Sequence, residues 1–373
     1  MKLLFVVTGI GLGHATRVDS VISEIKKRDK NAKICIAGYK SSLDYFKNSG
    51  FRKINLNGVD YSSENFKISI LNILRKNLNF PINFRRDIRL LMENIEEFNP
   101  DYVIVDWELS GLVAASRSNK KVVLIFNYDP YMFDSFIKKF KLNRFKILQR
   151  RFVESIYNLA NKRAEAIFIP GLKNKKENKF HFINFIVRKN PDELEDEDIL
   201  MKKLGLAKKP ILIMLGGSNF GYDLLDKMKS VLYELPNQEF IIFGYDRDFS
   251  NKNIKSYKFK ENYLEYLKTS KGVIMLAGHS SFAECAVFKK PCLVFPIRGH
   301  VEQMLNAYTI ERTKIGLVKY LKNIKKETIK EDIEEFIKKI DELQKRANNL
   351  NIKADGASKI AEFLIKRHQN GRD

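Results

Sequence analysis

The sequence predicts an α/β protein in which two doubly wound parallel sheets follow one another along the chain. Short apolar runs rich in β-branched residues alternate with longer segments whose apolar residues recur at helical spacing, which is typical of βαβ units. A glycine-rich turn joins a strand to a helix near the start of each half, in VVTGIGLGHATR (residues 6–17) and in LGGSNFG (215–221). Ligands of such sheets bind beyond the carboxyl ends of the strands, so we expect both turns to face one central cleft.

The strand candidates in each half are short and apolar. In the first half they are residues 2–8, 33–37, 101–106, 122–127 and 166–169. In the second half they are residues 210–215, 240–243, 272–275 and 291–295, with a helix from about residue 222 after the first of them. Alternation of strands and helices in both halves predicts two Rossmann-like sheets.

A polar stretch, GLKNKKENKF, follows Pro170 and precedes an acidic run at residues 192–198. We place the domain boundary in this region and expect a first domain at 1–170 and a second at 171–350. Residues 352–367 have the pattern of an amphipathic helix after a helix at 331–348. This last segment, 351–373, is predicted to pack back on the first domain.

The composition indicates a folded protein of the cytoplasm. The chain has 373 residues, of which 44% are hydrophobic and 12% aromatic. No apolar run approaches the roughly 20 residues of a membrane-spanning helix, and the N-terminus lacks the pattern of a secretory leader. Cys35, Cys285 and Cys292 form no Cys-x-x-Cys pair, so we expect buried thiols in a reducing compartment.

The net charge of +22 indicates an anionic partner. Residues 138–151 hold seven basic residues and no acid, interleaved with aromatic and aliphatic residues. A second basic cluster consists of Arg75, Lys76, Arg85, Arg86 and Arg89. Each stretch has the pattern of a basic amphipathic helix, and the one at 138–151 suits an anionic membrane surface, although lysine-rich helix faces that are merely solvated have the same pattern. Nucleic acid is disfavoured because none of its recognition motifs is present.

The N-terminal turn has the features of an anion site that also carries a base. Its free amides and the helix dipole favour a phosphate, and Gly11 and Gly13 allow close approach of the backbone. The third glycine of the dinucleotide fingerprint is replaced by His14, so NAD is disfavoured. An imidazole titrates near neutral pH and can take a proton from a hydroxyl group.

A second constellation lies at residues 277–307, AGHSSFAECAVFKKPCLVFPIRGHVEQMLNA. A turn of small residues is followed by a helix that contains Glu284. This pattern is expected for a phosphate-binding site with a carboxylate that binds ribose hydroxyls. Glu302 and Gln303 offer acceptors and a donor for neighbouring sugar hydroxyls.

These motifs resemble nucleotide-sugar glycosyltransferases of the GT-B fold, in the superfamily of the UDP-glucuronosyltransferases and the peptidoglycan N-acetylglucosaminyltransferase that acts on a lipid-linked precursor. Such enzymes pair an N-terminal glycine turn that holds a histidine with a C-terminal turn, a helix glutamate and an acidic-Gln-x-x-Asn-Ala segment. The resemblance is absent from residues 60–100 and 127–160, where acceptor recognition usually lies. Two departures, His279 in place of glycine and Glu302 in place of aspartate, bear on phosphate geometry and on sugar identity.

The resemblance implies an acceptor domain at 1–170, a donor domain at 171–350 and metal-independent, inverting transfer of a hexose-type sugar without a cofactor. The donor is expected to be a UDP-sugar, and the acceptor is a hydroxyl group, which could belong to a lipid-linked or glycolipid molecule on the inner membrane face. His14 would be the general base and Asp106 the carboxylate that orients it. Substrate-binding roles fall to Gly11, Gly13, Arg17, Gly216, Gly217, Ser218, Gly278, His279, Ser280, Ser281, Glu284, Glu302, Gln303 and Asn306.

Other interpretations remain open from the sequence alone. His14 could pack beneath its turn, and Asp106 could cap a strand end. Asp-x-Asp tripeptides at 196–198 and 246–248 match those of metal-dependent transferases but lie in an acidic run and a loop. A UDP-sugar 2-epimerase with the same fold and a basic surface-binding module are the rival functions.

Overall fold

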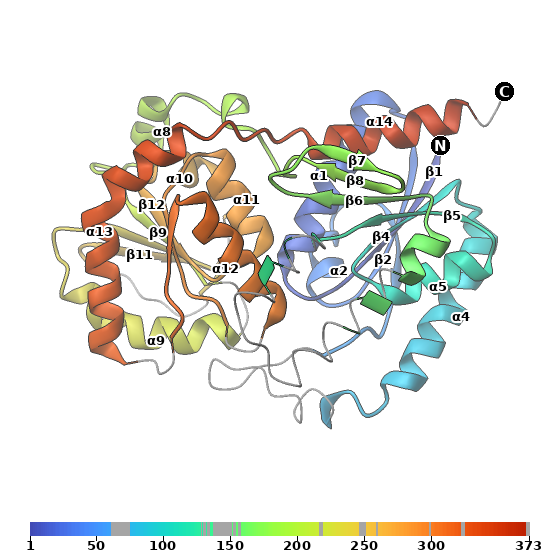
Figure 1. The fold of residues 1–373 in the computed structure, drawn as a ribbon, viewed down its shortest axis with the longest axis horizontal. Helices are drawn as coiled ribbons and strands as arrows, with labels where there is room; N and C mark the ends of the chain where they lie inside the picture. Colours follow the sequence, from blue (N-terminus) through green and yellow to red (C-terminus); the bar gives the residue numbers. More distant parts are fainter. Residues whose placement is uncertain are drawn as a thin grey trace. The chain divides into compact units, whose positions relative to one another are not determined.

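The computed structural model describes residues 1–60, 75–127, 158–215, 219–245, 251–258, 260–297, 300–321 and 325–370, with isolated residues between 128 and 157. The chain forms two compact units, shown in Figure 1. The first unit holds residues 1–61, 73–188 and 353–373, and the second holds residues 62–72 and 189–352. Each unit is built on its own sheet.

The first unit has an eight-stranded sheet in the order β3-β2-β1-β4-β5-β6-β8-β7. Its strands are β1 (Lys2–Val7), β2 (Lys33–Gly38), β3 (Arg52–Asn55), β4 (Tyr102–Asp106), β5 (Lys121–Ile125), β6 (Ala166–Pro170), β7 (Lys175–Glu177) and β8 (Phe180–Ile183). All neighbours are parallel except β7 and β8. The described helices are α1 (Leu12–Arg28), α2 (Ser41–Tyr45), α4 (Phe80–Phe98), α5 (Leu109–Arg117) and α14 (Gly356–Gln369).

The second unit has a six-stranded, fully parallel sheet in the order β11-β10-β9-β12-β13-β14. Its strands are β9 (Ile211–Met214), β10 (Phe240–Phe243), β11 (Ile254–Tyr257), β12 (Gly272–Met275), β13 (Cys292–Val294) and β14 (Gly316–Val318). Its helices are α8 (Glu197–Lys203), α9 (Asn219–Tyr233), α10 (Tyr263–Thr269), α11 (His279–Val287), α12 (Val301–Thr313) and α13 (Lys326–Asn348), with a 3-10 turn η1 (Pro191–Glu193).

The predicted fold class is confirmed, with differences at the edges of the sheets. Every predicted strand is present within a few residues, because each is a buried apolar run. The short strands β3, β7, β11 and β14 have weak sequence signals and were not predicted. The first unit runs to Arg188 rather than ending at residue 170, because β7 and β8 extend the first sheet beyond β6.

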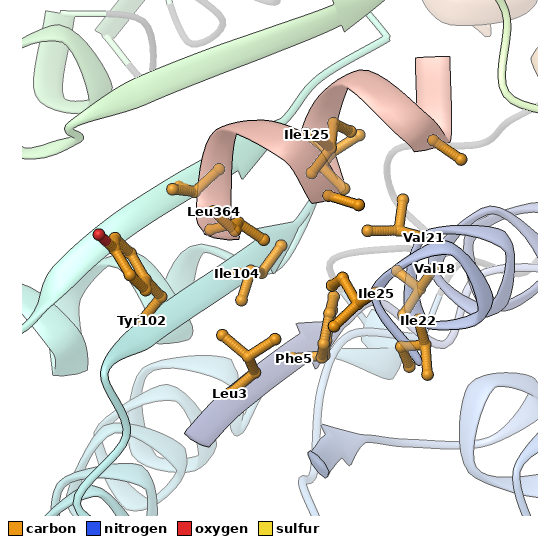
Figure 2. Packing of buried hydrophobic residues seen from close by; sticks show 14 of the residues in the cluster. Leu3, Phe5, Val18, Val21, Ile22, Ile25, Tyr102, Ile104, Ile125 and Leu364 are labelled. Carbon is orange, nitrogen blue, oxygen red and sulfur yellow. The ribbon is translucent and has the colours of Figure 1, made fainter. Parts of the chain in front are cut away.

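The C-terminal helix returns to the first unit, as predicted. Ile360 and Leu364 of α14 are fully buried in one cluster with Phe5 of β1 and with the apolar face of α1. Figure 2 shows Leu364 near Ile104 and the α1 residues beside Phe5. The helices α1 and α14 therefore cover one face of the first sheet together. Gly111 of α5 contacts Val6, which points to the other face.

Within the described residues, no helix is both long and apolar enough to cross a membrane. The three cysteines are buried free thiols. Burial raises the pKa of Cys35 to about 11 and that of Cys292 to about 12, so both thiols stay protonated at neutral pH.

Candidate active site

The N-terminal glycine turn connects β1 to α1 at the carboxyl edge of the first sheet. A side chain at Gly9 would place its Cβ 2.0 Å from the carbonyl oxygen of Tyr39, so the turn lies directly against the segment after β2. Gly11 has a φ of 77°, which glycine adopts at little cost, and it precedes the first residue of α1. His14 therefore lies in the first turn of α1, at the end of β1.

His14 contacts Asp106, the last residue of β4. The distance from His14 Nδ1 to Asp106 Oδ1 is 2.8 Å, and β4 pairs directly with β1. The Asp106 side chain is completely buried, whereas the His14 side chain keeps 13% exposure. We assign the proton to Nδ1, which donates it to the carboxylate, because this leaves Nε2 free as the acceptor of a proton.

Arg17 also donates hydrogen bonds to the carboxylate of Asp106. Its Nε donates to Asp106 Oδ2 at 2.8 Å, and its guanidinium group also donates to Asp106 Oδ1 and to Asn127 Oδ1. The Nη2 atom of Arg17 that donates to Asp106 Oδ1 also lies 3.0 Å from His14 Nδ1. Burial alone raises the pKa of Asp106, but Arg17 and His14 outweigh burial and hold it below its ordinary value. Asp106 is therefore an anion with two cationic or polar neighbours.

This arrangement gives Arg17 a role other than the predicted one. The residue is 3% exposed, and its guanidinium group is used inside the network rather than presented to a substrate. Asn127, which follows β5, was missed by the sequence analysis. The signal that could have found it is its place at the carboxyl edge of the sheet, beside the end of β4.

The backbone after Asp106 turns sharply. Trp107 has a φ of 54°, an uncommon conformation for a bulky residue, and its ring stacks on Phe126 at a centroid distance of 4.5 Å. Glu108 follows as the N-cap of α5 and is also buried. Strained backbone of this kind is concentrated at functional sites.

The second predicted constellation lies at the carboxyl ends of β12 and β13. Gly278 is the N-cap of α11, so His279, Ser280 and Ser281 form the first turn of that helix, where the helix dipole favours an anion. Glu284 lies further along α11 and is 6% exposed.

Two residues of α12 hold the parts of this constellation together. Asn306 donates from Nδ2 to the carbonyl oxygen of Ala277 at 2.9 Å and is 6% exposed. Gln303 accepts from the amide of Ile297 at 3.0 Å through Oε1, so its NH2 group is the part of the side chain that can donate. Glu302 lies in the first turn of α12. The hydrogen bond from Asn306 to Ala277 thus positions the turn before α11.

The turn at Gly216, Gly217 and Ser218 lies outside the described residues. Its flanks have the predicted strand-turn-helix form, since β9 ends at Met214 and α9 begins at Asn219. A Cβ at Gly221 would lie 2.2 Å from the carbonyl oxygen of Leu215, so only glycine lets α9 pack this closely against the end of the strand.

The sequence as a whole matches a family model. The model of glycosyl transferase family 1 covers residues 1–341, which is most of the chain. The chain belongs to glycosyl transferase family 1. As a member of this family, the protein is an enzyme of sugar transfer.

Two relatives illustrate the range of the family resemblance. An uncharacterized glycosyltransferase of Methanosarcina mazei is 26% identical over 396 aligned residues, which cover 98% of each chain. The UDP-N-acetylglucosamine--N-acetylmuramyl-(pentapeptide) pyrophosphoryl-undecaprenol N-acetylglucosamine transferase of Thermosipho melanesiensis is 26% identical over 53% of this glycosyltransferase and 61% of its own length.

Solved structures share the fold across nearly the whole chain, which confirms the predicted GT-B architecture. The glycotransferase of kitacinnamycin has a TM-score of 0.63 at 14% identity and covers 98% of both chains. A proposed UDP-N-acetylglucosamine 2-epimerase of Listeria monocytogenes has a TM-score of 0.64 at 13% identity, over 100% of this chain and 97% of its own. At these identities the similarity concerns the fold alone.

Proposed function

We propose that this glycosyltransferase transfers a hexose-type sugar from a UDP-sugar to a hydroxyl group with inversion, without a metal, on an acceptor held at an anionic membrane surface. The observation that carries the proposal is the contact between His14 Nδ1 and the buried carboxylate of Asp106, which leaves Nε2 as a base. The Thermosipho relative, whose name states a UDP-sugar donor and an undecaprenol-linked acceptor, supports the choice of substrates.

The chemistry needs three groups. Nε2 of His14 removes the acceptor proton as the hydroxyl oxygen attacks the anomeric carbon, and Asp106 stabilises the imidazolium that forms. The bond from the anomeric carbon to the diphosphate oxygen breaks on the opposite side, which inverts the configuration. The leaving UDP keeps the electron pair, and amides at the start of α11 can stabilise its added charge.

The donor assignment predicts the effect of one substitution. Glu284→Ala should weaken UDP binding by about 1.5–3 kcal/mol, because a charge-assisted hydrogen bond to the ribose would be lost. Calorimetric titration with UDP measures this, and Glu302→Ala serves as a matched control that removes a carboxylate assigned to the sugar instead. An unchanged affinity for UDP in the folded Glu284→Ala variant would contradict the assignment.

A basic and apolar surface at the start of α4 supports the membrane proposal. The stretch at residues 138–151, which the sequence analysis favoured for this role, lies outside the described residues except for Arg151. Leu78, Phe80 and Ile82, which lie between the basic residues of the second cluster along the chain, are 76%, 38% and 53% exposed. The cluster's five basic residues are exposed around them. Asp87, the acid between Arg86 and Arg89, is 2% exposed and accepts hydrogen bonds from Asn57 and Gly58.

Such a surface fits an anionic lipid headgroup region, because each cation near it contributes about 1 kcal/mol and the apolar side chains enter the interface. The wild type should sediment with anionic vesicles and not with neutral ones, and high salt should release it. Arg85, Arg86 and Arg89→Gln together, or Leu78, Phe80 and Ile82→Ser together, should abolish binding.

The matched control is Lys338, Lys345 and Arg346→Gln on α13, which removes the same number of charges from another exposed helix face. If the α4 and α13 variants bound the vesicles equally well, the lipid-binding surface would lie elsewhere on the chain. If the wild type bound no vesicles, the proposed membrane surface would be wrong.

A further inference from the structure

Tyr39 is a buried polar residue whose hydrogen bond leads toward the His14 site. It follows β2 and shares a hydrogen bond with the hydroxyl group of Thr8 at 2.9 Å, in which either oxygen can donate. Thr8 follows β1, and both residues are buried. Since β1 lies between β2 and β4 in the sheet, this bond joins two neighbouring strand ends at the edge where Asp106 lies.

The hydrogen bonds continue from Thr8 to Asp106 and His14. The amide of Thr8 donates to the carbonyl oxygen of Asp106 at 3.1 Å, which extends the pairing of β1 with β4 by one residue. The carboxylate of the same aspartate accepts from Nδ1 of His14 at 2.8 Å. The hydroxyl group of Tyr39 is therefore linked to the imidazole through two intervening residues.

The ring of Tyr39 is enclosed by two glycine residues. A Cβ at Gly9, in the N-terminal glycine turn, would lie 2.6 Å from a ring carbon of Tyr39, and a Cβ at Gly58 would lie 2.3 Å from another. A side chain at either position would therefore displace the ring. The hydroxyl group of Ser41 also donates to the carbonyl oxygen of Gly9 at 2.6 Å. The segment after β2 is thus fixed against the glycine turn by close packing and by a hydrogen bond.

The hydroxyl group of Tyr39 stays protonated at neutral pH. Burial is the main cause that raises its pKa to about 12, Glu108 adds to the increase, and the hydrogen bond with Thr8 opposes it. Tyr39 is therefore not a base under these conditions, and it can affect the reaction only through the groups that it holds in place.

We propose that Tyr39 is a positioning residue for the proton transfer, whose hydroxyl group holds Thr8 so that the end of β4 presents Asp106 to Nδ1 of His14. The proposal rests on the proposed function, since it concerns the base of the same reaction. Groups that move a proton must be held within about 0.5 Å of their productive geometry, and hydrogen bonds behind the reacting groups supply that restraint. Loss of the hydroxyl group should therefore slow transfer and leave the binding of the donor unchanged.

Proton NMR tests the positioning without turnover. The Nδ1 proton of His14, which is hydrogen-bonded to Asp106, should give a downfield signal that His14→Ala removes. Tyr39→Phe deletes only the hydroxyl group and should speed the exchange of this proton with water by about three- to tenfold, as for one lost hydrogen bond. Thr8→Val removes the other partner and should have the same effect.

Tyr45→Phe is the matched control for this measurement. It deletes a tyrosine hydroxyl group of the same unit that donates to Asp19 of α1 at the same distance of 2.9 Å. The exchange of the Nδ1 proton should stay at the wild-type rate in this variant. A rate that is unchanged by Tyr39→Phe, or raised equally by Tyr39→Phe and Tyr45→Phe, would overturn the proposal and leave Tyr39 with a packing role only.

A second measurement uses the reaction. With a UDP-sugar and glycerol, Tyr39→Phe should lower kcat by about three- to tenfold and leave the KM of the donor unchanged. The Tyr39→Phe, Thr8→Val double variant should lose about as much as Tyr39→Phe alone, because both changes remove the same bond. Additive losses, or a loss that appears in the KM of the donor, would contradict the proposal. If the wild type transfers no sugar, the proposed function fails, while the NMR result still decides the role of Tyr39.

Discussion

Arg17→Met is expected to destabilise the protein by about 3–5 kcal/mol at pH 7, because it leaves the Asp106 carboxylate buried without its main cationic partner. With Arg17 absent, burial raises the pKa of Asp106. Protonation of Asp106 then removes the unpaired charge, so the loss of stability relative to the wild type should become smaller as the pH is lowered from 7 to 4. Denaturant unfolding at several pH values measures both effects.

A double-mutant cycle provides the control for this expectation. Asp106→Asn alone leaves Arg17 buried with a weaker partner, and the Arg17→Met, Asp106→Asn double variant removes the charge of both. The double variant should lose less stability than the sum of the two single losses. Strictly additive losses would show that Arg17 and Asp106 act independently, contrary to the network in the structure.

His14→Ala is expected to lower the transfer rate by about 10²- to 10⁴-fold while UDP affinity stays the same. The acceptor proton then has no base, whereas the nucleotide is assigned to the turn before α11 on the other unit. Transfer kinetics and calorimetry with UDP separate the two effects. His368→Ala, a change at the C-terminal end of α14, is the matched control and should leave transfer unchanged. Full transfer by His14→Ala would remove His14 from the mechanism.

Much of the architecture is predictable from the sequence because it depends on local patterns. The apolar run before Gly9 and the helical spacing after it predict β1 and α1, and a parallel sheet then brings strand ends such as Asp106 to the edge where His14 lies. The C-terminal helix is predictable for the same reason, since Ile360 and Leu364 lie on one apolar face. Short edge strands such as β11 have little apolar pattern and depend on pairing with a neighbour.

The roles of individual polar side chains are less predictable. Arg17 lies one helical turn after His14, so the sequence predicts that the two residues are close. Its hydrogen bond to Asp106 joins residues that are 89 positions apart, and local spacing does not predict it. The role of Asn306 is hard to predict for the same reason, because its hydrogen bond to Ala277 joins α12 to the turn before α11.

The most direct test of the central claim is proton NMR of the reaction of an α-linked UDP-sugar with the purified protein, in the presence of glycerol or water as acceptor. The account predicts that UDP is released together with a β-configured product, which is the first-formed anomer even when water is the acceptor, and that His14→Ala suppresses both signals. An α-configured product, a UDP-sugar epimer without release of UDP, or the same release by His14→Ala would contradict inverting transfer by the His14 and Asp106 site.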